Sequence, residues 1–232
     1  KEQLQKEGVD IRGVITDPER LTALVILGIR DENTFPLIFY REDCADMALS
    51  EVDICEELIS ETNCVCVTGT HLSNSKVEKA TLKAIQIARR FGKKTALDID
   101  YRPNLWGLSG HDDGQNRYIR SEKVTQNLQK TLMLFDLIVG TEEEFHIAGG
   151  STNTIEALQN VRSKTSATLV CKRGPHGASL FEDAIKGDLD EGIQGRKFSI
   201  EVFNVLGAGD GFMAGFLRGW LRNETWSTCL DY

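Results

Sequence analysis

The sequence has no apolar run approaching the roughly 18 residues that a membrane-spanning helix requires. Its first seven residues are too charged to form the apolar core of a secretory signal. Basic residues are also scarce, since 27 Lys and Arg stand against 35 Asp and Glu and leave a formal net charge of −8. A surface of this sign repels nucleic-acid phosphates and anionic lipids. We therefore expect neither a nucleic acid nor a membrane as a partner.

Metal-binding spacings are missing as well. Among the six cysteines, Cys64 and Cys66 are separated by one residue, which is not the spacing of a zinc site. They lie in an apolar run typical of a strand, and we expect buried, reduced thiols in a cytoplasmic protein. The four histidines are scattered along the chain, so the sequence predicts no transition-metal site.

The composition is that of an ordinary globular protein, with 41% hydrophobic and 27% charged residues in a chain of 232. This length allows one large α/β domain, or one domain with an appendage. Residues 1–8 have the pattern of the end of a helix, and residues 9–41 predict an antiparallel meander with strands at 9–16, 22–29 and 36–40 and a polar turn at 30–33. With one apolar residue the helix cannot anchor itself, so we expect a preceding part of the domain to be absent.

Residues 42–232 predict an α/β core. After two short helices within 42–60, strand patterns alternate with helical patterns. The predicted strands are 64–67, 94–99, 137–139, 168–172, 178–181 and 198–203, and the predicted helices are 75–91, 121–134, 142–148, 152–164 and 213–221. Residues 64–67 have the continuous apolar run of a central parallel strand. Residues 183–197 are expected to form a surface excursion.

Five polar or glycine-containing loops follow these strands. They comprise residues 68–71, 98–106, 140–144, 172–177 and 207–210. Because the carboxyl ends of parallel strands meet at one edge of a sheet, these loops predict a composite pocket there.

The segment Gly207-Ala208-Gly209-Asp210 carries the strongest chemical indication. Its small residues permit close backbone approach, and the N–H groups at the start of a helix attract anions. Asp210 is badly placed to bind phosphate but well placed to take a proton from a hydroxyl, which indicates phosphoryl transfer to an alcohol. The alternative is an early-helix carboxylate stabilised by the helix dipole.

Together these motifs resemble the ribokinase-like (PfkB) carbohydrate kinases over nearly the whole chain. The resemblance implies ATP and Mg²⁺ as cofactors. In that family the segment equivalent to Gly207, Ala208, Gly209 and Asp210 provides an anion hole and the catalytic base. Residues 141–144 stand where the family has Asn-x-x-Glu, which implies a magnesium role for Glu144. The implied nucleotide residues are Lys172, Arg173, Gly174, Gly177 and Asn204.

Two departures from the family pattern are present. Asn204-Val205 replaces the usual Asp-Thr linked to a monovalent cation, and Thr141 replaces the usual Asn. The family's N-terminal part and its final segment also have no counterpart.

The loop from Asp98 to Trp106 resembles the segment Asp-x-Asn-x-Arg-x-x-Leu-Trp of kinases for keto-deoxy sugar acids. With residues 39–42 and 204–212 it implies 5-dehydro-2-deoxygluconate as the substrate, with 2-keto-3-deoxygluconate or another sugar as the alternative. The implied substrate residues are Arg41, His71, Asp100 and Arg102.

The resemblance implies an α/β ribokinase-like sandwich, truncated at both ends, in which residues 9–41 form a small antiparallel β lid and residues 42–232 an incomplete core. Lid strands pair between subunits in this family, which implies a homodimer. The alternative function is that of a non-catalytic fragment that binds nucleotide weakly or not at all.

Each site residue also has a structural alternative. Arg41, Lys172 and Arg173 could be solvated strand-end cations, and His71 a surface residue. Arg102 could form a salt bridge to Asp98 or Asp100. Glu144 could be a helix N-terminal carboxylate, stabilising without any metal.

Overall fold

The computed structural model describes residues 1–30, 36–110, 118–199 and 201–232. Within these residues, six strands form the main sheet in the spatial order β3-β4-β5-β6-β7-β8. Their bounds are β3 Cys64–Thr68, β4 Lys94–Asp98, β5 Leu137–Thr141, β6 Thr168–Lys172, β7 Ala178–Phe181 and β8 Ile193–Gln194. β3 to β6 run parallel, whereas β7 and β8 are antiparallel to their neighbours.

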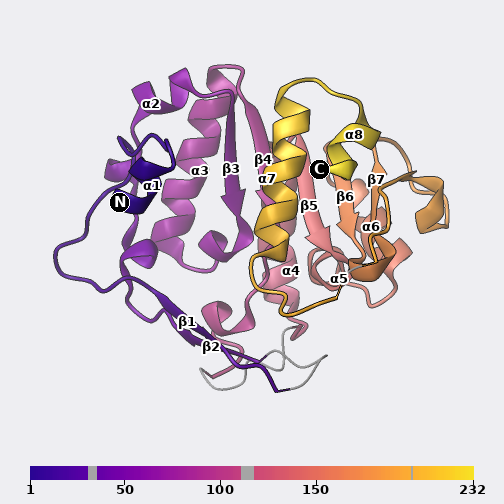
Figure 1. Ribbon diagram of the computed structural model, residues 1–232, viewed down its shortest axis with the longest axis horizontal. Helices are drawn as coiled ribbons and strands as arrows, with labels where there is room; N and C mark the ends of the chain where they lie inside the picture. The colour runs from indigo at the N-terminus through magenta and orange to yellow at the C-terminus, as the bar shows by residue number, and fades with distance from the viewer. Residues whose placement is uncertain (31–35, 111–117, 200) are drawn as a thin grey trace.

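Helices cover both faces of this sheet (Figure 1). The helices of the described residues are α1 Glu2–Lys6, α2 Glu56–Glu61, α3 Ser75–Arg90, α4 Glu122–Thr131, α5 Glu142–Gly149, α6 Thr154–Arg162, α7 Ala208–Leu221 and α8 Trp226–Asp231. Leu97, Ile138 and Leu169 pack into one apolar cluster with residues of α3 to α6. Their strand neighbours Val139 and Val170 pack into a second cluster with α7 and α8. Alternate residues of each strand thus enter opposite cores, which is why these strands are apolar throughout.

The predicted lid is a two-stranded antiparallel sheet, made of β1 Leu24–Leu27 and β2 Leu37–Tyr40. The expected strand at 9–16 is wrong, because the backbone turns there, with Val14 N donating to Ile11 O at 2.9 Å. The Arg12 guanidinium reaches back to Asp10 and across to Glu61, which fixes the turn. The predicted turn at 30–33 falls largely outside the described residues, and the division into lid and core at residue 41 stays a prediction.

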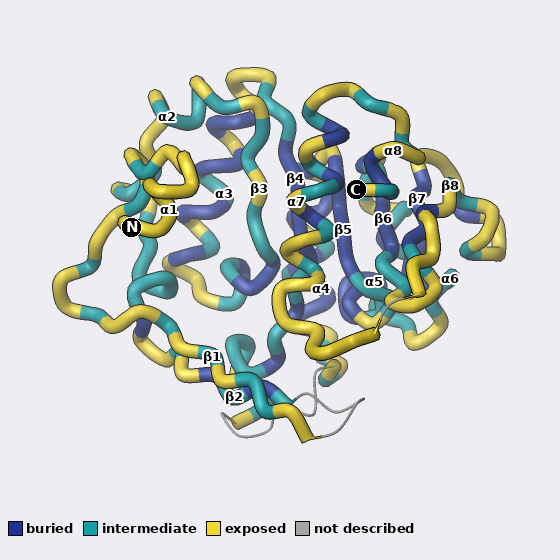
Figure 2. Tube along the Cα trace, in the orientation of Figure 1, coloured by how far each residue is buried: buried dark blue, intermediate teal, exposed yellow. Residues whose placement is uncertain are grey.

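Edge effects explain other differences from the sequence analysis. β3 lies at the edge of the sheet and not at its centre, and Figure 2 shows it less buried than β4 and β5. The prediction that Cys64 and Cys66 are buried is therefore wrong: Cys66 is exposed and Cys64 is intermediate, and both are free thiols. Residues 198–199 and 201–203 form no strand, because no described strand pairs with them, and Phe203 is 80% exposed.

Several elements differ in extent from the expectation. Residues 42–60 contain η1 Ala45–Ala48, η2 Glu51–Asp53 and α2 in place of two helices, and the expected excursion at 183–197 includes β8. The N-cap of α3 is Asn74, whose side chain accepts from Lys76 N at 2.9 Å. In none of the described ranges does a helix combine the length and apolar character needed to cross a membrane.

Close packing of α5 on α6 generates a stability prediction. A β-carbon at Gly149 would lie 2.3 Å from the backbone oxygen of Ala157. We expect Gly149→Ala to lower the free energy of unfolding by about 1–3 kcal/mol, because the two helices must move apart. Gly187→Ala is the control, since its β-carbon would meet nothing within 4 Å. Urea unfolding followed by circular dichroism measures both, and equal midpoints would contradict the packing argument.

Candidate active site

The first turn of α7 lies at the edge of the sheet where β3 to β6 end (Figure 1). Gly207 is its N-cap with φ +80°, a left-handed conformation that costs glycine little. Ala208, Gly209 and Asp210 form the first turn, so the helix begins earlier than the predicted Met213. Gly207 has no side chain to cap the first N–H groups, and Asp210 is exposed. This turn is therefore open to an anion, with a carboxylate beside it.

Lys172 brings a positive charge to the same turn. Its Nζ atom lies 3.5 Å from where a β-carbon of Gly209 would be, and 3.4 Å from Oδ1 of Asp98. The Lys172 and Asp98 side chains are only 14% and 11% exposed. Lys172 is thus a largely buried ammonium aimed at the start of α7, and the alternative of a solvated strand-end cation does not apply to it.

Asp98 had no site role of its own in the sequence analysis, which placed it at the start of the segment 98–106 and as a possible partner of Arg102. Burial raises the pKa of Asp98 to about 6, against the opposing charge of Lys172, and the nearby carboxylates Glu144 and Asp100 raise it further. Its position at the end of a buried strand, two residues before Asp100, was the available signal. The Asp98 carboxyl therefore gains or loses its proton near pH 6.

Glu144 connects two of the predicted loops. Its Oε2 accepts from Thr141 N at 2.8 Å in a capping box, and its Oε1 accepts from Tyr101 N at 3.2 Å. The residue is 4% exposed, and both oxygens are engaged. Nor do the described ranges contain any group of three His, Cys, Asp or Glu side chains suited to a metal ion. These contacts match the helix-capping alternative, and the expected magnesium role of Glu144, which would act through water, stays a prediction.

The predicted substrate residues gather around His71. Burial lowers the pKa of His71, the charge of Arg41 lowers it further, and Asp46 and Asp100 act in the opposite direction. Arg41 forms an ion pair with Asp46. Arg102 forms one with Asp100 at 2.7 Å, which is the structural alternative for that residue. Asp46 was missed by the sequence analysis, because nothing in its spacing from Arg41 marks a partner. The site thus pairs each of its two cations with an internal carboxylate.

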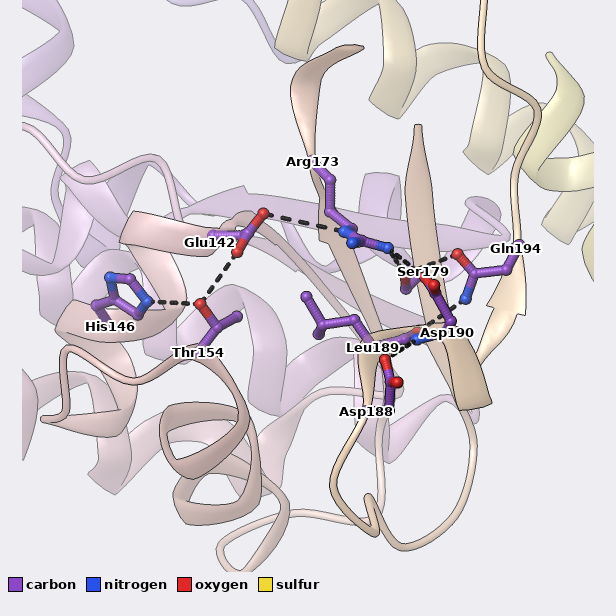
Figure 3. A network of polar contacts seen from close by, with 9 residues as sticks. All are labelled: Glu142, His146, Thr154, Arg173, Ser179, Asp188, Leu189, Asp190 and Gln194. Atoms are coloured by element: carbon purple, nitrogen blue, oxygen red, sulfur yellow. Dashed lines mark hydrogen bonds and ion pairs between the residues drawn. The ribbon is translucent and has the colours of Figure 1, made fainter. Parts of the chain in front are cut away.

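The remaining residues that were predicted to bind nucleotide lie in two segments. Gly174 and Gly177 have φ +53° and +81°, and Arg173 N donates to Gly177 O at 2.8 Å, which closes the turn between β6 and β7. Arg173 is not a solvated cation, because its guanidinium contacts Glu142, Ser179 and Asp190 (Figure 3). Asn204 is exposed before α7, and its Oδ1 accepts from Leu206 N at 3.0 Å.

Comparison with known proteins agrees with this arrangement. The chain matches the pfkB family of carbohydrate kinases over residues 1–232. It belongs to this family. The 5-dehydro-2-deoxygluconokinase of Halalkalibacterium halodurans is 27% identical over 229 residues, covering 97% of this chain and 64% of that protein. The enzyme of that name from Bacillus subtilis is 25% identical, covering 99% and 66%. The chain thus spans about two thirds of the length of these pfkB relatives.

Solved pfkB structures share the fold. A PfkB protein from Polaromonas superposes with a TM-score of 0.77 at 21% identity, covering 99% of this chain and 70% of that one. A Vibrio cholerae fructokinase with bound fructose, ADP and calcium gives 0.76 at 22% identity, covering 99% and 69%. A Pyrococcus horikoshii sugar kinase in complex with ATP gives 0.72 at 21% identity, covering 95% and 64%. The predicted ribokinase-like fold with a small antiparallel sheet is confirmed.

The raised pKa of Asp98 predicts a pH-dependent stability difference. Well below pH 3.8 the carboxyl is protonated in both the folded and the unfolded state. As the pH rises toward 6 the unfolded state ionises first, so the free energy of unfolding should fall, by about 3 kcal/mol at most for a pKa raised from 3.8 to about 6. The Asp98→Asn variant has no carboxyl at this position, so its free energy of unfolding should not fall in this way. Urea unfolding of both proteins at pH 4, 5, 6 and 7 should show the wild type losing stability relative to the variant, and parallel curves would contradict the assignment.

Proposed function

We propose that the protein containing this chain transfers the γ-phosphoryl group of ATP to a hydroxyl of 5-dehydro-2-deoxygluconate, a keto-deoxy sugar acid. The observation that carries this proposal is the Lys172 ammonium against the first turn of α7, with Asp210 one residue beyond Gly209. A cation and the N–H groups of Gly209 and Asp210 at the helix start form an anion site, and the adjacent carboxylate supplies a base. The names of the relatives support the choice of substrate.

In the proposed reaction, the N–H groups of Gly209 and Asp210 and the Lys172 ammonium stabilise negative charge on the transferred phosphoryl group, whereas the N–H of Ala208 donates to Val205 O at 3.3 Å. Asp210 accepts the proton of the attacking hydroxyl. A new O–P bond forms while the bond from the γ-phosphorus to ADP breaks, and ADP leaves with the electron pair. Mg²⁺ enters with ATP as part of the substrate complex, and no step requires Glu144 as its ligand.

The cations beside His71 fit a sugar that carries a carboxylate. A guanidinium has five N–H donors, so Arg41 and Arg102 can retain Asp46 and Asp100 while donating to a further carboxylate. The same argument applies to 2-keto-3-deoxygluconate, which is the alternative substrate. Competition between the two acids in one assay distinguishes them, because the preferred substrate is consumed first.

A second candidate is that these 232 residues bind nucleotide without catalysing transfer. It is favoured by the open edge of β3 among the described residues, where unpaired backbone groups and Cys66 are exposed. Calorimetric titration with MgATP, in the presence and absence of the sugar acid, tests it. Tight and mutually coupled binding would exclude it.

A homodimer through β1 and β2, and a cytoplasmic location, stay predictions.

Removing the proposed base should abolish most of the turnover. Asp210→Asn keeps the shape of the side chain but cannot accept the proton, so kcat should fall by about 10² to 10⁴. The affinity for ATP should be retained, because the substitution removes a negative charge near the phosphates. Asp183→Asn, an exposed carboxylate after β7, is the control and should leave kcat unchanged. Near-normal turnover of the Asp210 variant would refute the proposed mechanism.

Replacing Arg41 or Arg102 should weaken binding of the sugar acid more than binding of a neutral sugar. Arg41→Gln and Arg102→Gln should each raise KM for the sugar acid about tenfold or more, because a charge-assisted hydrogen bond is lost. KM for a neutral keto sugar such as fructose should change little. Arg89→Gln, which lies on α3 and donates to Leu134 O, is the matched control. Equal effects on the acid and the neutral sugar would argue against carboxylate recognition here.

A further inference from the structure

Lys172 and Arg173 are consecutive, yet they serve opposite sides of the sheet. Val170 packs in the cluster with α7, whereas Cys171 packs in the cluster with α4 to α6. This alternation continues past the strand: Lys172 reaches Gly209 of α7, and Arg173 reaches Glu142 of α5, with Nε 3.9 Å from Oε1. The two cations therefore do not share one anion site.

The contacts of Arg173 form a network (Figure 3). Its Nη1 atom donates to Oδ1 of Asp190 at 2.8 Å and to Oγ of Ser179 at 3.3 Å. The Arg173 side chain is 17% exposed, and its hydrogen bond to Asp190, with a smaller contribution from its charge, lowers the pKa of that carboxyl. Gln194 of β8 accepts from Ser179 at 3.1 Å and donates to the backbone oxygen of Leu189 at 2.8 Å.

The other end of the network lies in the helices. Glu142 accepts from Thr154 Oγ1 at 3.0 Å, and that oxygen lies 2.9 Å from Nε2 of His146. Arg173 is thus joined to α5, through Glu142 to the start of α6, and through Asp190 to η7 (Leu189–Glu191).

The turn that follows Arg173 depends on this anchoring. It has left-handed glycines at Gly174 and Gly177, and it closes through the hydrogen bond from Arg173 N to Gly177 O. A β-carbon at Gly177 would lie 2.9 Å from Gly195 O, so the turn also packs on the segment after β8. Glycine-rich turns have many accessible conformations, and a fixed side chain at their base restricts them.

We propose that Arg173 is a positioning residue for the nucleotide site: it holds the turn at 174–177, and through the backbone the direction of Lys172, without touching phosphate itself. This inference rests on the proposed function, in which ATP phosphates bind at Lys172 and the start of α7. It replaces the sequence expectation that Arg173 contacts the phosphates.

The test uses partners of Arg173 that a nucleotide would not touch. We expect Asp190→Asn and Glu142→Gln each to weaken ATP binding about three- to tenfold, and Arg173→Gln at least as much, with kcat changed less than about threefold. The double variant Arg173→Gln/Asp190→Asn should be no weaker than Arg173→Gln alone, because the residues act as one unit. Arg173→Lys should not restore affinity, since an ammonium lacks the fork that spans the three partners. Calorimetry with MgATP gives the affinities and a coupled assay gives kcat.

Direct phosphate binding by Arg173 predicts different results from the positioning role. If Arg173 binds phosphate directly, Asp190→Asn leaves ATP affinity unchanged or tighter and Arg173→Lys restores binding, and either result overturns the inference. A double variant weaker than Arg173→Gln by the factor that Asp190→Asn alone imposes would also overturn it, because the two residues would then act independently. Absence of ATP binding by the wild-type protein would overturn the proposed function as well. Should Arg173→Gln fail to fold, the exposed Asp190 variant still decides, with thermal unfolding confirming that it is folded.

Discussion

The structure of the site depends on the ion pair between Lys172 and Asp98. A buried ammonium without a partner would lose its proton or find another geometry, so the carboxylate at the end of β4 fixes the cation at the end of β6, two strands away. Asp98 itself is disfavoured in its charged form by burial and by neighbouring Glu144 and Asp100. The sheet therefore positions this ion pair, and the pair itself contributes little to the stability of the sheet. Its consequence is a positive charge fixed at the open start of α7.

The charged groups around this pair differ in role between the two faces of the sheet. The face toward α7 holds the groups that suit phosphate, namely Lys172 and the first turn of the helix. The opposite face holds groups that only fix loops, such as Arg173 with its acidic partners. Glu144 bridges the loop after β4 and the start of α5, so its buried charge serves geometry. Charged residues at one edge thus differ in role according to the face on which their strand places them.

The interior of the fold was predictable because its strands are continuous apolar runs. Residues 168–172 and 178–181 coincide with β6 and β7, and the five loops do follow strands or begin a helix. Elements at the boundary were not predictable in this way. Residues 64–67 have the composition of a central strand but lie at the edge, and residues 198–203 have a strand pattern without a described strand to pair with them. The sequence of a segment shows which of its side chains could be buried. Whether they are buried depends on which neighbouring strands or helices pack against the segment. For the same reason Asp98 and Asp46 were missed, since their importance comes from neighbours distant in the chain or unmarked by spacing.

In the proposed function, selectivity for the sugar acid follows from charges that are already paired within the protein. Arg41 and Arg102 each have an internal carboxylate, and the pKa of the nearby His71 is lowered by burial and by Arg41. In this proposal an acidic sugar gains affinity by sharing guanidinium donors with Asp46 and Asp100. Such sharing requires the planar fork of arginine and a substrate carboxylate in the right orientation. A neutral sugar gains nothing from it. Internal pairing thus keeps the cations fixed before binding and makes the position of the carboxylate, beyond its charge, the feature that the site can recognise.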